Sequence, residues 1–175
     1  MAASPKIYQA HGSISRFKGD YHFLSNFHRQ PFYLAGWSGM FDSAEHAFQA
    51  SKALTGEAAG WVREASSPEL AKSRGRQIET HLDWDRRKRT VMARILLAKF
   101  TDPELAAKLA ATYPIPLIEG NTWGDTYWGA VGHDQRGWED PSLPWWNIAP
   151  GISLAGHNWL GRTLMMVREL VRDET

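Results

Sequence analysis

The stretch FDSAEHAFQASK, residues 41–52, decides how the chain is interpreted, because it predicts a helix with a polar face. At about 100° per residue, the side chains of Glu45, Gln49 and Lys52 project in the same direction. An amphipathic helix normally carries apolar residues at that spacing. We therefore expect a carboxylate, an amide and an amine to share one surface, which either faces solvent or belongs to a pocket.

Each of these side chains also has a purely structural interpretation. Asp42 lies three residues before Glu45, so Glu45 could complete a capping box at the start of the helix. Lys52 could sit at the negative end of the helix dipole, and Gln49 could be an ordinary surface residue. The residues alone leave these alternatives open.

The composition limits the class of protein. With 175 residues and 43% hydrophobic content, the chain can form one well-buried core, and we expect a single domain over residues 1–175. The absence of cysteine excludes disulfides, thiolate metal sites and cysteine nucleophiles. The seven histidines show no metal-binding spacing, so we expect no metal. A net charge of +1 argues against a generally basic binder of nucleic acids.

The chain carries no sign of membrane insertion or secretion. No apolar run approaches the roughly 20 residues of a membrane span, and the N-terminus lacks the segments of a secretory signal. We expect a cytoplasmic protein.

Local patterns predict a mainly α fold of the α+β class, with a few short strands within residues 6–35. After the first helix, which should end near residue 54, the caps and prolines predict helices at about 57–65, 67–75, 84–100, 102–113 and 158–172. Residues 114–156 are expected to form a long ordered loop.

In the 84–100 helix the basic residues 86–89 should face water, and the buried stripe should comprise Val91, Ile95, Leu96 and Leu97. The last helix should bury Leu160, Leu164, Val167, and Leu170 or Val171.

A second notable segment is GNTWGDTYWG, residues 120–129. Its glycines would allow close approach of the backbone to a ligand, and Trp123 and Trp128 could stack on a base or a sugar. The alternative is a tight turn capped by Asn121 and Asp125, with the two tryptophans packed beneath it.

Six segments together resemble the NADAR family, whose name stands for NAD and ADP-ribose. They match in order and spacing over nearly the whole chain, and they are GDYHFLSNF (19–27), EHAFQASK (45–52), SSPELAKSRGR (66–76), LDW (82–84), the NTWGDTYWG block and NWLGRTLMMVREL (158–170). The resemblance implies a compact, mainly helical domain and an N-glycosidase activity without a cofactor. One branch of the family cleaves phosphoribosylamino-pyrimidine intermediates of riboflavin synthesis, and the other removes ADP-ribose from guanine bases. The FLSNF and GNTWGD segments look closer to the second branch.

The resemblance also suggests roles for individual residues. It places the family's functional positions on Glu45, Lys52, Trp84 and Asp125, with Ser25, Asn26 and Asn121 near the ligand. Beside them we expect Gln49, Trp123 and Trp128 to contact the substrate, and Arg74 and Arg76 to bind its pyrophosphate. Surface salt bridges are the alternative for the two arginines, and a core position is the alternative for Trp84.

Cleavage of a ribosyl C1–N bond passes through an oxocarbenium-like state, which carboxylates such as Glu45 and Asp125 can serve. Alternatively, the neutral amine of Lys52 could attack the anomeric carbon of the opened sugar and form a Schiff base. That route needs a lysine whose pKa is lowered from about 10.4. The residues do not decide between the two routes.

One segment departs from the family pattern. Residues 133–155, rich in tryptophan and proline, stand where the family passes almost directly from one glycine block to the next. Trp138, Trp145 and Trp146 could stack on the leaving base or on flanking nucleotides. A lid packed on the core, or a dimer contact, is the alternative.

Together these observations predict an N-glycosidase that removes ADP-ribose from guanine in nucleic acid, with a DNA ADP-ribosyltransferase as its functional partner. A riboflavin-pathway glycosidase and a non-catalytic ADP-ribose-binding module are the alternatives. Retention of Glu45, Asp125 and Lys52 favours an enzyme over a binding module.

Overall fold

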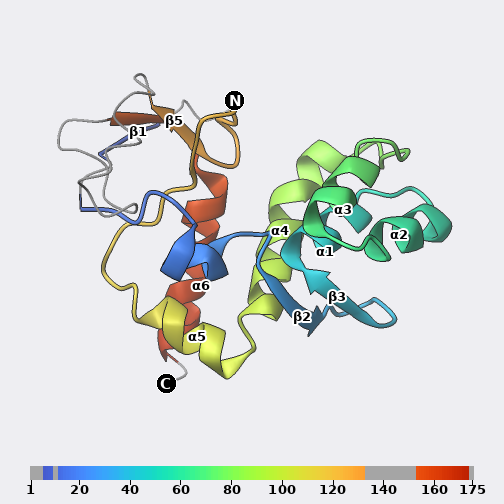
Figure 1. Cartoon of the computed structure of the whole chain (residues 1–175), viewed down its shortest axis with the longest axis horizontal. Helices are drawn as coiled ribbons and strands as arrows, with labels where there is room; N and C mark the ends of the chain where they lie inside the picture. Colours follow the sequence, from blue (N-terminus) through green and yellow to red (C-terminus); the bar gives the residue numbers. More distant parts are fainter. Residues whose placement is uncertain (1–5, 10–11, 133–152, 174–175) are drawn as a thin grey trace. The chain divides into compact units, whose positions relative to one another are not determined.

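The computed structural model describes residues 6–9, 12–132 and 153–173. The described residues form two compact units, one built from residues 25–106 and the other from residues 1–24 together with 107–175. Helices dominate and the strands are short, which confirms the predicted mainly α, α+β fold (Figure 1). The assignment of residues 1–175 to a single domain stays a prediction.

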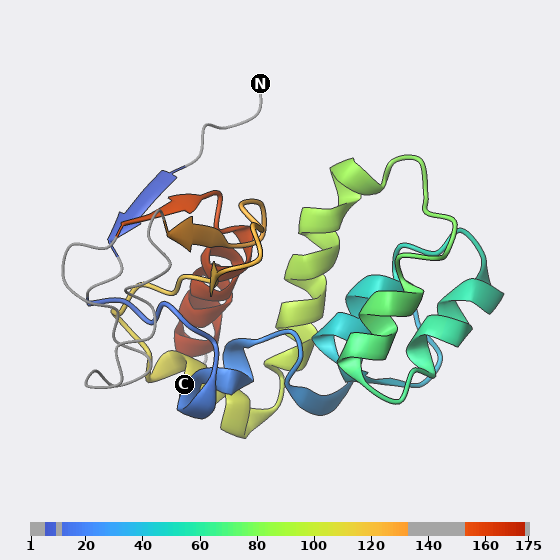
Figure 2. The same cartoon turned by 45° about the horizontal axis from the view of Figure 1, so that its top comes forward.

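The unit of residues 25–106 is a helical cluster beside a hairpin (Figure 2). Its elements are β2 (Arg29–Tyr33), β3 (Met40–Ser43), α1 (Ala44–Ala50), α2 (Gly56–Arg63), α3 (Pro68–Arg74) and α4 (Trp84–Lys99). The strands β2 and β3 pair antiparallel. Helix α1 is in contact with α2, α3, α4 and β3, and every one of its residues is buried. The side chains of α1 are therefore held in place by four other elements of this unit.

Caps explain where the helices of this unit begin. Ser43, Thr55 and Ser67 adopt extended backbone, and the side chain of each accepts a hydrogen bond from an amide in the first turn of its helix. Pro68 then opens α3, where its missing N–H costs nothing.

Glu45 does not complete a capping box, which was the structural alternative for this residue. The cap of α1 is Ser43, whereas the Asp42 carboxylate pairs with Arg29 at 3.0 Å. The first helix is also shorter than expected and ends at Ala50 instead of residue 54. It ends there because residues 52–54 bond to residues 79–81: Leu54 donates its N–H to the Glu79 carbonyl, and the Lys52 carbonyl accepts from the His81 N–H.

The buried face of α4 differs from the prediction. Met92, Ile95, Leu96 and Lys99 are the buried residues, whereas Leu97 is 39% exposed. This i, i+3, i+4, i+7 set is a regular helical stripe, but its last member is a lysine, a residue type whose charge normally places it on the surface.

The other unit combines a sheet with helix α6. Its elements are β1 (Lys6–Gln9), the 3₁₀ helix η1 (Gly19–Leu24), β4 (Gly120–Asn121), β5 (Ala130–Gly132), β6 (Ser153–Gly156) and α6 (Trp159–Asp173). The sheet has the strand order β1-β6-β5-β4, in which only β4 and β5 are parallel. Three of these strands lie within residues 114–156, where we had expected a loop. Helix α5 (Pro103–Ala110) spans the boundary between the two units.

Helix α6 is anchored by a charged residue. Leu160, Leu164 and Val167 are buried as predicted, but the next buried position is Arg168, and Leu170 is 48% exposed. The Arg168 guanidinium donates to the carbonyl oxygens of Thr112 and Ile115. The last buried position of α6 is therefore Arg168, and not Leu170 or Val171 as expected, because the carbonyl oxygens that face it accept its hydrogen bonds.

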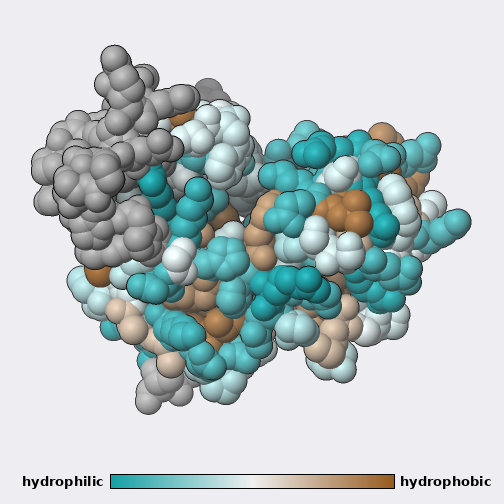
Figure 3. Space-filling model, in the orientation of Figure 1, coloured by the Kyte–Doolittle hydropathy of each residue, from teal (hydrophilic) through white to brown (hydrophobic). Residues whose placement is uncertain are grey.

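The face seen in Figure 3 is mainly hydrophilic, with hydrophobic side chains scattered over it. No helix in the described part of the chain is both long enough and apolar enough to cross a membrane.

Candidate functional site

Glu45 is a buried carboxylic acid on helix α1. Its side chain is buried with only 5% of the residue exposed, and its carboxylate accepts a hydrogen bond of 2.7 Å from Gln49 Nε2. Burial raises the pKa of Glu45, since removal from water disfavours the charged form. The Gln49 hydrogen bond and the nearby charges of Lys72, Lys52 and Arg76 act in the opposite direction but do not outweigh burial.

Gln49 lies one turn after Glu45 and is clamped against helix α3. A Cβ atom on Gly75 would come within 2.1 Å of Gln49 Oε1 and 2.8 Å of its Cβ, so this approach requires glycine. Gln49 Oε1 is buried and has no hydrogen-bond partner among the described residues. An unpaired buried acceptor is costly, which makes this oxygen a candidate acceptor for an N–H or O–H of a ligand.

Lys52 stands in the turn that follows α1. Burial lowers its pKa, the Glu45 carboxylate raises it, and the charges of Lys72 and Arg76 lower it further, with burial dominating. Its Nζ is 5.8 Å from the centre of the Phe48 ring, and that ring contacts Trp84 at 5.1 Å. The structure thus brings the three polar side chains and the half-buried Trp84 into one neighbourhood of one unit.

Lys72 belongs to this neighbourhood and was missed by the sequence analysis. It affects the pKa values of both Glu45 and Lys52, and its Nζ lies 5.4 Å from the Phe27 ring. One feature of the sequence could have pointed to Lys72. Lys72 and Arg76 are spaced i, i+4 after the cap of α3, which places two positive charges on one side of the chain. Periodicity within one helix cannot show that this side faces another helix.

The two arginines predicted to bind pyrophosphate differ in their surroundings. Arg76 is close enough to Glu45 and Lys52 to affect both pKa values. Arg74 instead donates to the Trp61 carbonyl at 2.5 Å, and its guanidinium lies 5.0 Å from the Trp61 ring centre. Arg76 therefore lies near Glu45 and Lys52, whereas Arg74 is bonded to Trp61 of helix α2.

The carbonyl groups of Ser25 and Asn26 hold two different residues, Lys99 and Glu45. The Asn26 carbonyl accepts the Glu45 N–H at 2.9 Å, and the Ser25 carbonyl accepts from Lys99 Nζ at 2.9 Å. Lys99 is 1% exposed, and burial lowers its pKa to about 7. Asn26 Oδ1 is another buried oxygen without a partner in the described part of the chain.

The GNTWGDTYWG segment lies in the other unit, where its polar side chains build the loop. Asn121 is 2% exposed; its Oδ1 accepts the Asp125 N–H, and its Nδ2 donates to the Asp125 carbonyl. Asp125 Oδ1 accepts the N–H groups of Tyr127 and Trp128, both at 2.9 Å. The capped turn that we considered as the alternative is thus present.

The tryptophans of this loop are not packed beneath it as that alternative assumed. Trp123 is 63% exposed, and Trp128 is half-buried with its ring 5.1 Å from Tyr127 in an edge-on contact. The backbone of residues 126–129 bonds to residues 157–160, which fixes the loop at the start of α6. Trp138, Trp145 and Trp146 lie outside the described residues.

No cluster among the described residues suggests a metal ion. Groups of three or more His, Asp or Glu side chains that could hold one do not occur in residues 6–9, 12–132 or 153–173. Glu45, Gln49 and Lys52, the α1 cluster, offer a buried acid, an amide and an amine for chemistry.

Comparisons with known proteins agree with the sequence blocks. The model of the NADAR domain matches residues 15–172. The N-glycosidase YbiA of Escherichia coli (strain K12) is 35% identical over 158 residues, which cover 89% of this chain and 84% of that protein. The N-glycosidase Npun_R5314 of Nostoc punctiforme is 30% identical over 174 residues, covering 96% and 90%.

The fold points the same way. The NMR structure of E. coli YbiA superposes with a TM-score of 0.70 at 32% identity, covering 94% of this chain and 88% of that one. With a family match over residues 15–172, the chain belongs to the NADAR family.

Proposed function

We propose that the protein is an N-glycosidase whose chemistry centres on Glu45 and Lys52. The observation that carries this proposal is a buried carboxylic acid with a raised pKa beside an amine with a lowered pKa. Environments that push two titratable groups toward their neutral forms are typical of acid–base sites. The N-glycosidases of E. coli and Nostoc punctiforme, at 35% and 30% identity, support the same reaction class.

A protonated Glu45 can act as the general acid. As the ribosyl C1–N bond breaks, its proton passes to the departing nitrogen, and the resulting carboxylate stabilises positive charge on the ribosyl carbon. Gln49 holds the Glu45 carboxyl through its 2.7 Å hydrogen bond. Gln49 Oε1, buried without a partner in the described chain, is available for a donor on the substrate.

Lys52 supplies the second half of the reaction in this proposal. When the sugar ring opens, C1 and the base nitrogen are joined as an imine; the neutral Lys52 amine adds to C1, and one of its protons passes to that nitrogen. The C1–N bond then breaks as the nitrogen takes the Glu45 proton, so that the base leaves as its free amine and a protonated Schiff base joins C1 to Lys52. Water then hydrolyses the Schiff base, which releases the free sugar and restores the amine. Burial and the charges of Lys72 and Arg76 lower the Lys52 pKa, which favours the reactive form.

The substrate we propose is guanine carrying ADP-ribose, in nucleic acid. Arg76 and Lys72 supply positive charge for a pyrophosphate beside the Glu45 and Lys52 pair. Trp84 offers a half-buried ring next to them. A DNA ADP-ribosyltransferase is the class of enzyme that would produce this substrate.

The test is mass spectrometry of a short DNA strand carrying ADP-ribosylated guanine. We expect the wild-type protein to remove the ADP-ribose mass and Glu45→Gln to leave it in place, because the amide cannot donate the acidic proton. Glu57→Gln, an exposed carboxylate on α2, is the matched control and should behave as wild type. An intact strand with wild-type protein would contradict the nucleic-acid substrate. Cleavage of a phosphoribosylamino-pyrimidine would then identify the riboflavin-type alternative, and tight ADP-ribose binding without product would identify a binding module.

The role of Lys52 has its own test. Borohydride added during turnover should trap a covalent adduct with wild-type protein, and Lys52→Met should abolish it. Lys108→Met, an exposed lysine on α5, serves as the control. Turnover by wild type without any trapped adduct would favour direct attack by water.

A further inference from the structure

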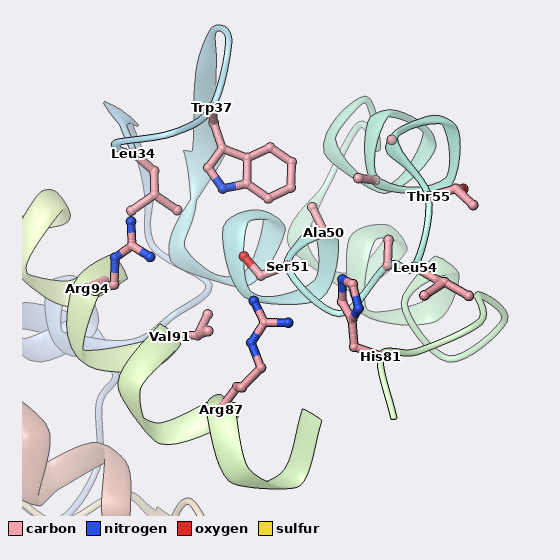
Figure 4. A pocket seen from close by; sticks show the side chains of 13 residues that line it. Leu34, Trp37, Ala50, Ser51, Leu54, Thr55, His81, Arg87, Val91 and Arg94 are labelled. Atoms are coloured by element: carbon pink, nitrogen blue, oxygen red, sulfur yellow. The ribbon is translucent and has the colours of Figure 1, made fainter. Parts of the chain in front are cut away.

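A cavity of about 280 Å³ lies within the same unit, next to the turn that follows α1. Neither Glu45, Gln49 nor Lys52 lines it. Its walls come from the β2–β3 hairpin, the turn after α1, the start of α2 and one face of α4 (Figure 4). The proposed glycosidase chemistry therefore makes no use of this space.

The polar groups of the cavity are mainly hydrogen-bond donors. Arg87, Val91 and Arg94 line it from one face of α4, because i, i+4 and i+7 positions share a side of a helix. Figure 4 shows the Arg87 guanidinium directed between Ser51 and His81, with the indole of Trp37 on the opposite side. None of the residues that line the cavity is acidic. Such a donor-rich, carboxylate-free wall favours an anion.

The groups that would bind an anion are already oriented. The Trp37 ring meets the buried Phe41 ring edge-on at 5.1 Å. Arg94 Nη2 donates to the Ala35 carbonyl at 3.1 Å, which ties α4 to the hairpin. Arg87 pairs with Asp83 at 3.5 Å, but both side chains are about half exposed, so this pair is weak and can yield to a ligand.

The remaining wall is apolar and suits a ring. It consists of small and aliphatic side chains, namely Leu34, Ala50, Ala53, Leu54, Ala59 and Val91. The volume lies just below the range of about 300–1,000 Å³ that is usual for small-molecule pockets, so the cavity suits one nucleotide unit and is too small for a dinucleotide.

We propose that this cavity binds a single nucleotide unit, with its phosphate on Arg87 and His81 and its base or ribose against Trp37 and the aliphatic wall. The unit is either a free mononucleotide or one nucleotide of a strand, since both present the same phosphate and ring. The proposal does not rest on the glycosidase activity, because the two sites share no side chain.

The test follows the indole N–H signals of ¹⁵N-labelled full-length protein by NMR during titration with guanosine 5′-monophosphate. Trp37 and Trp84 are assigned by the signal lost in Trp37→Phe and in Trp84→Phe, so that the signal of Trp37 reports the cavity and that of Trp84 the Glu45 neighbourhood. We expect the Trp37 signal to shift in a saturable manner. The dissociation constant should rise at least about tenfold in Arg87→Met, whereas Arg86→Met, an exposed neighbour outside the cavity, should leave it unchanged.

Ligand fragments and a strand complete the experiment. Guanosine and inorganic phosphate should each bind more weakly than the nucleotide, because each fills half of the site. A short single-stranded DNA is titrated in parallel with guanosine 5′-monophosphate. Whichever of the two shifts the Trp37 signal with the lower dissociation constant identifies the nucleotide that the cavity binds, free or within a strand. A shift of the Trp84 signal alone, equal binding to wild type and Arg87→Met, or equal binding of inorganic phosphate and nucleotide would overturn the proposal.

Discussion

At the scale of single residues, the contact between Gly75 and Gln49 is the tightest constraint on the α1 cluster. Gly75 has ordinary helical backbone angles, so its identity is set by space and not by conformation. The Gln49 side chain fills the space that any Cβ at position 75 would occupy.

We expect Gly75→Ala to displace Gln49 and to destabilise the protein by about 1–3 kcal/mol through overpacking. Catalytic turnover should fall as well, because Gln49 holds the Glu45 carboxyl. Urea unfolding and the mass-spectrometric assay measure the two effects. Gly60→Ala, at a helix position with open space around the added methyl group, should be neutral or stabilising by about 0.5–1 kcal/mol. Adding Gln49→Ala to Gly75→Ala should restore much of the stability, and strictly additive losses would contradict the clash.

Asp125 has a structural role in its loop and a predicted catalytic role, and substitutions can separate the two. Its Oδ1 accepts two backbone N–H groups, and an asparagine keeps that oxygen while it removes the charge. If the charge serves catalysis, Asp125→Asn should keep the wild-type melting temperature and lose about 100-fold or more in kcat. Asp125→Ala should lose stability too, because two amides lose their acceptor. Full activity in Asp125→Asn would restrict Asp125 to building the loop.

At the scale of elements, caps decide where the functional helix begins. Ser43 Oγ accepts from the His46 N–H, and the same hydroxyl lies 2.8 Å from His46 Nδ1. We expect Ser43→Ala to cost about 1 kcal/mol of stability and to lower turnover, because the first turn of α1 carries Glu45. Thr55→Ala removes the equivalent cap of α2, which carries none of the proposed catalytic residues. It should cost similar stability but leave turnover intact; equal losses of turnover would contradict a specific link between the α1 cap and Glu45.

Element positions could be predicted where they depend on local signals. The Ser67-Pro68 start of α3 and the final helix follow from caps and periodicity within a few residues. The strands β4, β5 and β6 could not be found in this way, because they are two to four residues long and their sheet is completed by β1, which is distant in sequence. The buried Lys99 was missed for a related reason, since its partner is the Ser25 carbonyl, 74 residues away.

The same distinction holds for the candidate site. The Glu45, Gln49 and Lys52 neighbourhood was visible because it lies within eight consecutive residues. Lys72, the clamp at Gly75 and the nucleotide cavity depend on how helices pack, which no single-helix pattern contains.

At the scale of the whole molecule, Lys99 makes stability depend on pH. Its pKa is about 7 in the folded protein and about 10.4 in an unfolded chain. Between these values the unfolded chain binds more protons, so the free energy of unfolding rises as pH increases. From pH 7 to pH 9 this group should add on the order of 1–3 kcal/mol.

The comparison is urea unfolding of wild type and Lys99→Met at both pH values. The variant loses a hydrogen bond to Ser25 and is expected to differ in absolute stability, so the informative quantity is the change with pH. The wild-type free energy of unfolding should rise relative to that of the variant. Parallel pH dependence of the two proteins would contradict a neutral buried lysine.

The pairing of β5 with β6 has a consequence for how this chain can be modified. Gly132 and Leu154 lie directly opposite each other in the antiparallel pair, so the chain leaves and re-enters the sheet at neighbouring positions. A tight turn between these two positions would leave the strand order β1-β6-β5-β4 unchanged. An engineer could therefore close the β5–β6 pair with a two-residue turn, or insert a foreign sequence as a cassette at this point, and use the pairing of Gly132 with Leu154 to check that the sheet is kept.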